Sequence, residues 1–195
     1  MGCTQLIEVR MTVEEYFELE KQSEIRHEYY NGNIYAMAGT TLNHNRIVGK
    51  VRNLLGNHFL PRGCDVFSEN VKVKVSDKYY PYPDVIVTCA PKDISGTYVV
   101  EHPSILVEVT SKHSEGNDRG LKLQQYRTIS SLQYYLLVSQ IEHSVDIHAR
   151  VEGDNLWTWR SFENLEDIIR LEAFDFEMSL KAIYENITFE PETVQ

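Results

Sequence analysis

Two acidic residues in otherwise apolar, strand-like segments are the positions where chemistry is most expected. Glu108 lies inside Ser104-Ile-Leu-Val-Glu-Val-Thr110, a short β-branched run typical of a buried strand. Asp84 opens a second such run, Pro83-Asp-Val-Ile-Val-Thr88. A buried carboxylate is very costly unless a cation or hydrogen bonds compensate it. The pair therefore favours a metal site built from residues of two core strands.

The segment that follows Glu108 supplies a candidate cation. Residues 118–129 are predicted to form a helix, and one of its faces carries Asp118, Leu121, Lys122, Gln125, Tyr126 and Ile129. Because the apolar residues favour the core, this face should meet the sheet and bring Lys122 near Glu108, where an ammonium needs an anion. The alternative is a surface ion pair between Asp118 and Lys122, worth only a few tenths of a kcal/mol.

The remaining pattern predicts an α/β fold with a mixed central sheet flanked by helices. Thr12 and Glu15 form a capping box that begins a helix, and Asn31-Gly32 between aromatic arms indicates a β-hairpin. A long helix is expected from Leu42 to Leu60, and a short one over 180–185. Strands are expected at 65–68, 71–75, 84–89, 104–110, 134–139, 144–150, 157–162 and 168–171. The alternation of 71–75 predicts one solvent-facing side.

Length and composition describe an ordinary globular chain. Its 195 residues are 42% hydrophobic and fit one domain spanning 1–195. No run approaches the roughly 18 apolar residues of a membrane helix, and the N-terminus lacks a secretory signal, so a cytoplasmic location is expected. Three cysteines without metal-ligand spacing, Cys3, Cys64 and Cys89, are expected to be reduced thiols.

The net charge of −10 is unfavourable for tight, non-specific nucleic-acid binding, which needs Lys and Arg at phosphates. Charge is uneven, however, because Arg46, Lys50 and Arg52 cluster on the helix expected over 42–60. They could form a nucleic-acid-binding edge, although a solvated helix face is the commoner explanation.

These motifs, in this order, resemble those of the PD-(D/E)XK nuclease superfamily. The motifs are Pro83-Asp84, Glu108-Val109 and Asp118-x-x-x-Lys122-x-x-x-Tyr126. The closer similarity is to the Uma-type endonuclease family, a domain of unknown function numbered 820, and it extends over most of the chain. The resemblance implies a restriction-endonuclease-like fold with an N-terminal helix and β-hairpin.

One position departs from the superfamily pattern. Its lysine usually stands two residues after the glutamate, where this chain has Thr110. The resemblance then implies a migrated lysine, Lys122, that reaches the same space from the adjacent helix.

The resemblance also implies a ligand set. Asp84, Glu108 and the main-chain carbonyl of Val109 would bind Mg²⁺, with Mn²⁺ as a substitute, because hard cations prefer oxygen. Asp84, Glu108 and Lys122 would be catalytic. Glu28, which matches a superfamily acid, could extend the ligand set, and otherwise is an exposed hairpin acid. His44 could contact phosphate, and otherwise is a capping or packing residue.

The leading hypothesis is a Mg²⁺-dependent endonuclease that hydrolyses phosphodiester bonds in DNA. A non-catalytic module that binds nucleic acid or protein on the same fold is the alternative, because fold does not establish function. A hydrolase of another phosphodiester is a third possibility. A homodimer is also expected, with the Tyr-rich hairpin or Trp157 and Trp159 as its aromatic interface.

Overall fold

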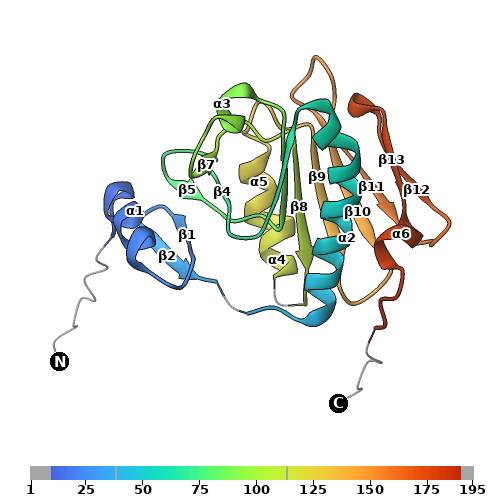
Figure 1. Ribbon diagram of the computed structural model, residues 1–195, viewed down its shortest axis with the longest axis horizontal. Coiled ribbons are helices and arrows are strands. Elements are labelled where there is room, and N and C mark those ends of the chain that lie inside the picture. Colours follow the sequence, from blue (N-terminus) through green and yellow to red (C-terminus); the bar gives the residue numbers. More distant parts are fainter. Residues whose placement is uncertain (1–9, 38, 113, 190–195) are drawn as a thin grey trace, which may run out of the picture.

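The protein is built around a mixed six-stranded sheet, seen in a computed structural model that describes residues 10–37, 39–112 and 114–189 (Figure 1). The strand order is β11-β10-β9-β8-β6-β3. Only β8 and β9 run parallel, and the other neighbours are antiparallel. In chain order the strands are β3 (Asp65–Ser68), β6 (Val85–Thr88), β8 (Ile105–Thr110), β9 (Tyr134–Ser139), β10 (Val145–Arg150) and β11 (Trp157–Phe162). The predicted mixed sheet is confirmed.

One face of the sheet is covered by a long helix and a C-terminal hairpin. Helix α2 (Leu42–Phe59) crosses this face, as Figure 1 shows, and continues into the 3₁₀ turn η1 (Leu60–Arg62). Strands β12 (Ile168–Leu171) and β13 (Phe176–Ser179), joined by η3 (Glu172–Phe174), and helix α6 (Leu180–Tyr184) complete this layer. Alternate strand residues such as Val85, Val107 and Leu136 face it and are fully buried.

The opposite face carries a helical segment in three parts. It consists of α4 (Glu115–Asn117), the π-helical turn η2 (Asp118–Lys122) and α5 (Leu123–Tyr126). Tyr126 and Ile129 pack there against Ile86, Leu106 and Tyr135. The helix predicted over 118–129 therefore begins three residues earlier and ends at Tyr126, but it does face the sheet. The parallel pair β4 (Lys72–Val73) and β7 (Val99–Val100) lies on the same side, and α3 (Pro91–Ile94) precedes β7.

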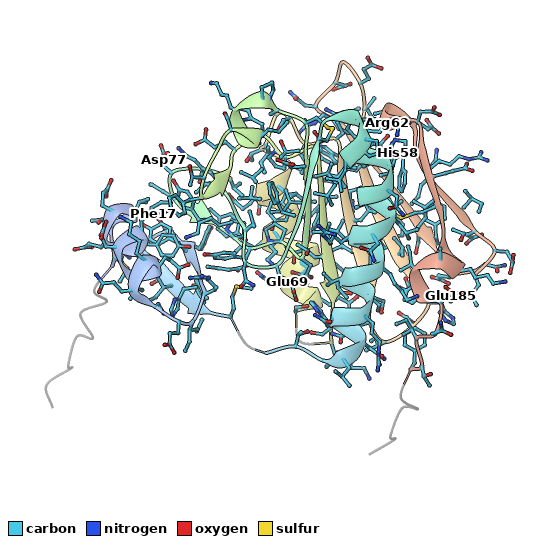
Figure 2. All side chains as sticks on the ribbon, viewed as in Figure 1. Phe17, His58, Arg62, Glu69, Asp77 and Glu185 are labelled. Atoms are coloured by element: carbon cyan, nitrogen blue, oxygen red, sulfur yellow. A yellow bond between two sulfur atoms is a disulfide. The ribbon has the colours of Figure 1, made fainter. Side chains whose placement is uncertain are left out.

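A small N-terminal lobe stands beside the sheet, at the left of Figure 1. Helix α1 (Val13–Gln22) begins with the predicted capping box of Thr12 and Glu15. The predicted hairpin is also confirmed, with β1 (His27–Tyr30) paired to β2 (Asn33–Ala36) through Asn31 and Gly32, both at positive φ. Strand β5 (Tyr79–Tyr80) adds to β1. Side chains fill the region between this lobe and the sheet (Figure 2).

The predicted strand over 71–75 is wrong in length and in exposure. Only Lys72 and Val73 form a strand, outside the central sheet. Lys72, expected on the solvent side, is 7% exposed because it pairs with the buried Glu20 of α1. The alternation of residues 71–75 did not predict this burial, because the partner Glu20 belongs to an element about fifty residues earlier in the chain.

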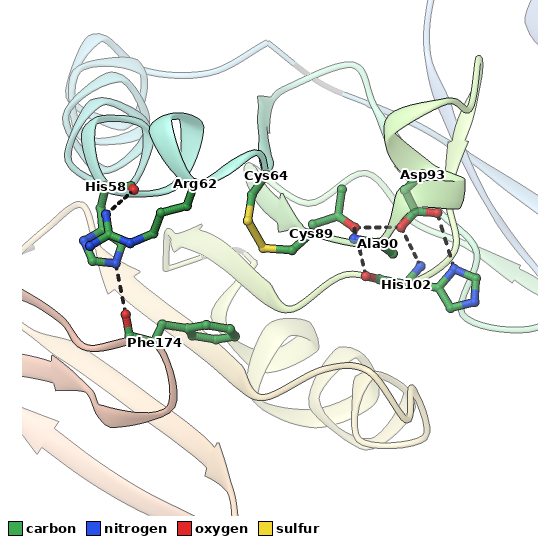
Figure 3. The surroundings of a disulfide bond; sticks show 9 residues. His58, Arg62, Cys64, Cys89, Ala90, Asp93, His102 and Phe174 are labelled. Carbon is green, nitrogen blue, oxygen red and sulfur yellow. Dashed lines mark hydrogen bonds and ion pairs between the residues drawn. A yellow bond between two sulfur atoms is a disulfide. The ribbon is translucent and has the colours of Figure 1, made fainter.

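The prediction of reduced thiols is also wrong for two cysteines. Cys64 and Cys89 form a disulfide (Figure 3), while Cys3 lies outside the described residues. Strands β3 and β6 pair Asp65 with Thr88, so one further step of this antiparallel register places the two cysteines opposite each other. Cysteine spacing along the chain could not reveal this, because the register of two strands sets the distance.

No helix among the described residues is long and apolar enough to cross a membrane.

Candidate active site

The two acids of the core strands meet across neighbouring strands. Strands β6 and β8 pair Val85 with Val107, so the same register continued by one residue sets Asp84 opposite Glu108. Directly opposed residues project to the same face of a sheet, with Cβ atoms about 5 Å apart. That face is the one covered by η2 and α5, since Ile86 and Leu106 also pack there.

Asp84 is fixed by a main-chain donor and a histidine. Its Oδ2 accepts a hydrogen bond from the Val109 N–H at 2.6 Å and lies 3.2 Å from Nε2 of His44. The N–H and C=O of one residue in an extended strand point to the same side, so the Val109 carbonyl is directed toward the same edge. Asp84, Glu108 and the main chain of Val109 therefore lie together at the end of β8.

His44 reaches Asp84 from the first turn of α2. Thr41 caps this helix by accepting from the His44 N–H, which fixes where the helix begins. Burial by itself lowers the pKa of His44, but the hydrogen bond and charge of Asp84 outweigh it, so the pKa is raised. Its Nδ1 is buried and has no hydrogen-bond partner in the described part of the chain. His44 is therefore neither a simple cap nor an apolar packing residue.

Glu108 is 4% exposed and is compensated by two donors from the helical segment above it. Nζ of Lys122 lies 3.0 Å, and the hydroxyl of Tyr126 2.9 Å, from the same Oε1 atom. Burial raises the pKa of Glu108 well above its usual value; Lys122 opposes this shift and the neighbouring acids add to it. Tyr126 is thus a buried core ring, as its place on the inward helical face predicted, and its hydroxyl also contacts a site residue.

The ammonium of Lys122 is surrounded by three carboxylates. It lies 3.0 Å from Glu108, 3.3 Å from Glu28 and 3.5 Å from Asp118. Burial alone would lower the pKa of Lys122, but these acids outweigh it and hold the pKa well above its ordinary value. The Asp118–Lys122 pair does exist at i,i+4 spacing, but it is buried, so the surface alternative is wrong.

Glu28 enters the site from the N-terminal lobe. Its Oε1 accepts a hydrogen bond from the Tyr82 N–H at 3.2 Å as well as meeting Lys122. Its side chain is 19% exposed, so it is not a freely solvated hairpin acid. The lobe and the sheet therefore share this site.

Asp118 is a further residue of the site, although no site role was predicted for it. It is 2% exposed, and burial raises its pKa although Lys122 opposes the shift. The main-chain carbonyl of Asp118 also accepts from the Tyr135 hydroxyl at 3.1 Å. Its place on the same helical face as Lys122 and Tyr126 predicted the inward direction, with the surface ion pair as the alternative.

The basic residues of α2 do not converge on the acids. Arg46 is exposed and donates to Asn43, and Lys50 lies 3.9 Å from Glu185. Arg52 is half-buried and, six residues after Arg46, points to a different side of the helix. The site itself lies at the lower edge of the sheet in Figure 1, where β8 ends and α2 and α4 begin.

The donor set suits a cation that needs few protein ligands. No three His, Cys, Asp or Glu side chains within residues 10–37, 39–112 and 114–189 are arranged to hold a metal ion by themselves. Mg²⁺ keeps several waters and is commonly bound through one or two carboxylates. Among the contacts of the described residues, the Asp84 carboxylate accepts only through Oδ2 and the Glu108 carboxylate only through Oε1. Oδ1 of Asp84 and Oε2 of Glu108 are therefore left for such an ion.

Comparison with known proteins supports the fold. A crystal structure described as "a putative nuclease belonging to DUF820" from Anabaena variabilis superposes with a TM-score of 0.72 and 17% identity, covering 89% of this chain and 97% of that one. Two uncharacterised proteins of Synechocystis are each 33% identical. The protein slr1290 matches 92% of this chain and 94% of its own, and sll1609 matches 75% and 84%.

The fold and the buried acid–lysine cluster define a protein of the restriction-endonuclease-like class. Residues 13–182 match the Uma2 family, whose description is "Putative restriction endonuclease". The chain belongs to this family.

Proposed function

We propose that this protein is a metal-dependent endonuclease that hydrolyses phosphodiester bonds in DNA. The observation that carries the proposal is the meeting of Asp84 and Glu108 across β6 and β8, with the Lys122 ammonium 3.0 Å from Glu108. Two carboxylates beside one buried ammonium are costly for folding. The family match and the nuclease-like fold support a catalytic reason for keeping them.

Each residue has a proposed role. Asp84, Glu108 and the Val109 carbonyl would hold Mg²⁺ or Mn²⁺, and Glu28 would hold a water molecule of its hydration shell. The bound ion would supply Lewis-acid polarisation of the phosphate and a lowered pKa for a water nucleophile. Lys122 would orient that water and offset the negative charge that develops on the phosphate. His44 would hold the Asp84 carboxylate through Nε2.

The alternative is a non-catalytic module that binds nucleic acid or a protein on the same fold. The net charge of −10 favours the protein-binding form of this alternative, since it opposes attraction of a polyanion. A cleavage assay separates the two. Supercoiled plasmid and single-stranded oligonucleotides are incubated with Mg²⁺, with Mn²⁺ or with a chelator, using the wild-type protein, Asp84→Ala and Lys122→Ala. The proposal requires ion-dependent cleavage that both substitutions abolish.

Arg170→Ala is a matched control for loss of one surface cation. Arg170 forms an exposed ion pair with Glu177 on the β12–β13 hairpin, away from the site. The Arg170→Ala variant should cleave DNA as the wild type does. Equal cleavage by all variants would identify a contaminating nuclease, and binding without cleavage would favour the alternative. A panel of smaller phosphodiesters tests the third possibility.

A homodimer and a cytoplasmic location stay predictions. Trp159 and Tyr35 are 59% and 54% exposed, so the aromatic surfaces suggested for a dimer contact are available. Light scattering at micromolar concentration that shows only monomer would contradict the dimer.

A further inference from the structure

A second buried charge cluster lies under the N-terminal lobe, apart from the acids and lysine of the site. Glu20 of α1 and Lys72 of β4 are each 7% exposed, and Nζ of Lys72 lies 3.3 Å from Oε2 of Glu20. The ammonium also sits over the rings of Tyr16, Phe17 and Tyr82, at 4.6, 4.8 and 5.3 Å from their centroids. Phe17, labelled in Figure 2, marks this region.

Glu20 contacts both chain segments that lead into the site. Its Oε1 accepts from the His27 main-chain N–H at 3.1 Å and lies 3.1 Å from the His27 ring, directly before Glu28. Its Oε2 accepts from the hydroxyl of Tyr82, two residues before Asp84. The Tyr82 N–H in turn donates to Glu28. One carboxylate thus joins the segment of Glu28 to the segment of Asp84.

Tyr16 strengthens the same connection. It is fully buried, and its hydroxyl donates to the His27 carbonyl at 2.8 Å. The His27 peptide is therefore held by α1 at its N–H, through Glu20, and at its C=O, through Tyr16. These contacts fix the position of β1, and with it Glu28, relative to α1.

We propose that Glu20, paired with Lys72, is a positioning residue that holds Glu28 in place beside Lys122 and Asp84 in place beside Val109. The purpose of this positioning rests on the proposed nuclease function. The positioning itself can be tested without measuring cleavage. A buried ion pair usually adds little net stability compared with apolar residues of similar volume, whereas it does constrain geometry. The cluster is accordingly expected to act mainly on the placement of the site.

The decisive variant replaces both charges with apolar residues, Glu20→Leu with Lys72→Met. If the pair only stabilised the lobe, a well-folded double variant would keep the site unchanged. If the pair positions the site, the double variant has a displaced site while it is still folded in the absence of urea. Its urea midpoint is expected to fall, because the His27 N–H and the Tyr82 hydroxyl lose their acceptor. Glu177→Gln, in an exposed ion pair, is the control for loss of a carboxylate.

The readout is the amide proton of Val109 in two-dimensional NMR of the metal-free protein. Its 2.6 Å hydrogen bond to Asp84 should give a strongly downfield resonance that is protected from exchange. The double variant is expected to shift this resonance upfield and to speed its exchange at least tenfold, and Glu177→Gln to change neither. A folded double variant with the Val109 resonance and exchange of the wild type would overturn the proposal.

A milder variant tests the same proposal if the double variant does not fold. Tyr82→Phe removes only the hydroxyl that donates to Glu20 and leaves the Glu20–Lys72 pair intact. The Val109 amide should move in the same direction by a smaller amount, and an unchanged resonance would again contradict the proposal. Because no cleavage is measured, failure here is separable from failure of the nuclease assay.

Discussion

Lys122 places its ammonium 3.0 Å from Oε1 of Glu108, although the two residues belong to a π-helical turn and a buried strand that are separate elements. Two more carboxylates, those of Glu28 and Asp118, lie within 3.5 Å of the same nitrogen. One buried cation therefore compensates three acids, so removing it should affect stability in a pH-dependent way.

The variant Lys122→Met keeps the length of the side chain and removes the charge. We expect the unfolding free energy at pH 8 to fall by about 3–5 kcal/mol, the usual cost of leaving a buried charge unpaired. The pKa of Glu108 is raised in the folded state, so protonation favours folding at low pH and this stability is lost as pH rises. Without Lys122 the pKa of Glu108 rises further, so protonation of Glu108 relieves the unpaired charge more readily at low pH. The loss should therefore be smaller at pH 5 than at pH 8. Urea unfolding at both values measures it, and equal losses would contradict the assignment.

His44→Ala tests the residue that contacts Asp84. If His44 orients a metal-binding carboxylate, cleavage supported by Mg²⁺ should fall by about 10–100-fold, as expected for residues that hold a ligand. His58→Ala is a matched control, because His58 lies in the last turn of the same helix and meets the Phe174 carbonyl at 3.0 Å (Figure 3). A similar loss in both variants would indicate a general defect of the helix.

The Cys64–Cys89 disulfide should contribute measurably to stability. It links residues 25 apart in sequence, and closing a loop of that length is worth about 3 kcal/mol in the unfolded-chain entropy treatment. The double variant Cys64→Ser with Cys89→Ser, and the wild type in excess reductant, should both unfold at lower urea concentration. Alkylation followed by mass spectrometry checks the pairing; two freely alkylated thiols without reductant would contradict it.

Asp93 should contribute an acid-sensitive part of stability. Burial opposes its ionisation, but hydrogen bonds from the main chain of Glu101 and His102 and from Thr88 outweigh burial and lower its pKa (Figure 3). A carboxyl whose pKa is lower in the folded state stabilises the protein above its unfolded pKa of about 3.9 and loses this effect as pH falls through the folded pKa.

Asp93→Asn places an amide N–H against one of the groups that donate to the Asp93 carboxylate. The free energy of unfolding at pH 7 should therefore fall by about 1–3 kcal/mol. The difference from the wild type should begin to shrink below about pH 4, because the carboxyl takes up a proton in the unfolded state there before it does so in the folded state. Unfolding measured from pH 3 to pH 7 tests the dependence. A difference that stays constant over this range would show that the charge of Asp93 is not responsible.

Much of the local structure followed from short patterns. The Thr12–Glu15 capping box, the Asn31-Gly32 hairpin and the apolar run around Glu108 form the elements that their residues favour. The inward direction of Lys122 also followed, because its apolar neighbours Tyr126 and Ile129 share its helical face. Such features depend on residues within one or two turns, which the sequence displays directly.

Other features depended on partners far along the chain. Lys72 was predicted to be solvent-facing and is buried, because its compensating charge comes from Glu20 of another element. The sequence left two alternatives for Asp118, an inward direction and a surface pair with Lys122, and the structure shows the pair buried. Cys64 and Cys89 face each other only through the register of β3 and β6.

The sequence by itself determined the strands of the central sheet, most of the helices and the acids that need a counter-charge, because periodicity and burial cost are local properties. Only the tertiary structure decided which groups share that charge, since the strand register sets Asp84 opposite Glu108 and the docking of the N-terminal lobe brings Glu28 to Lys122.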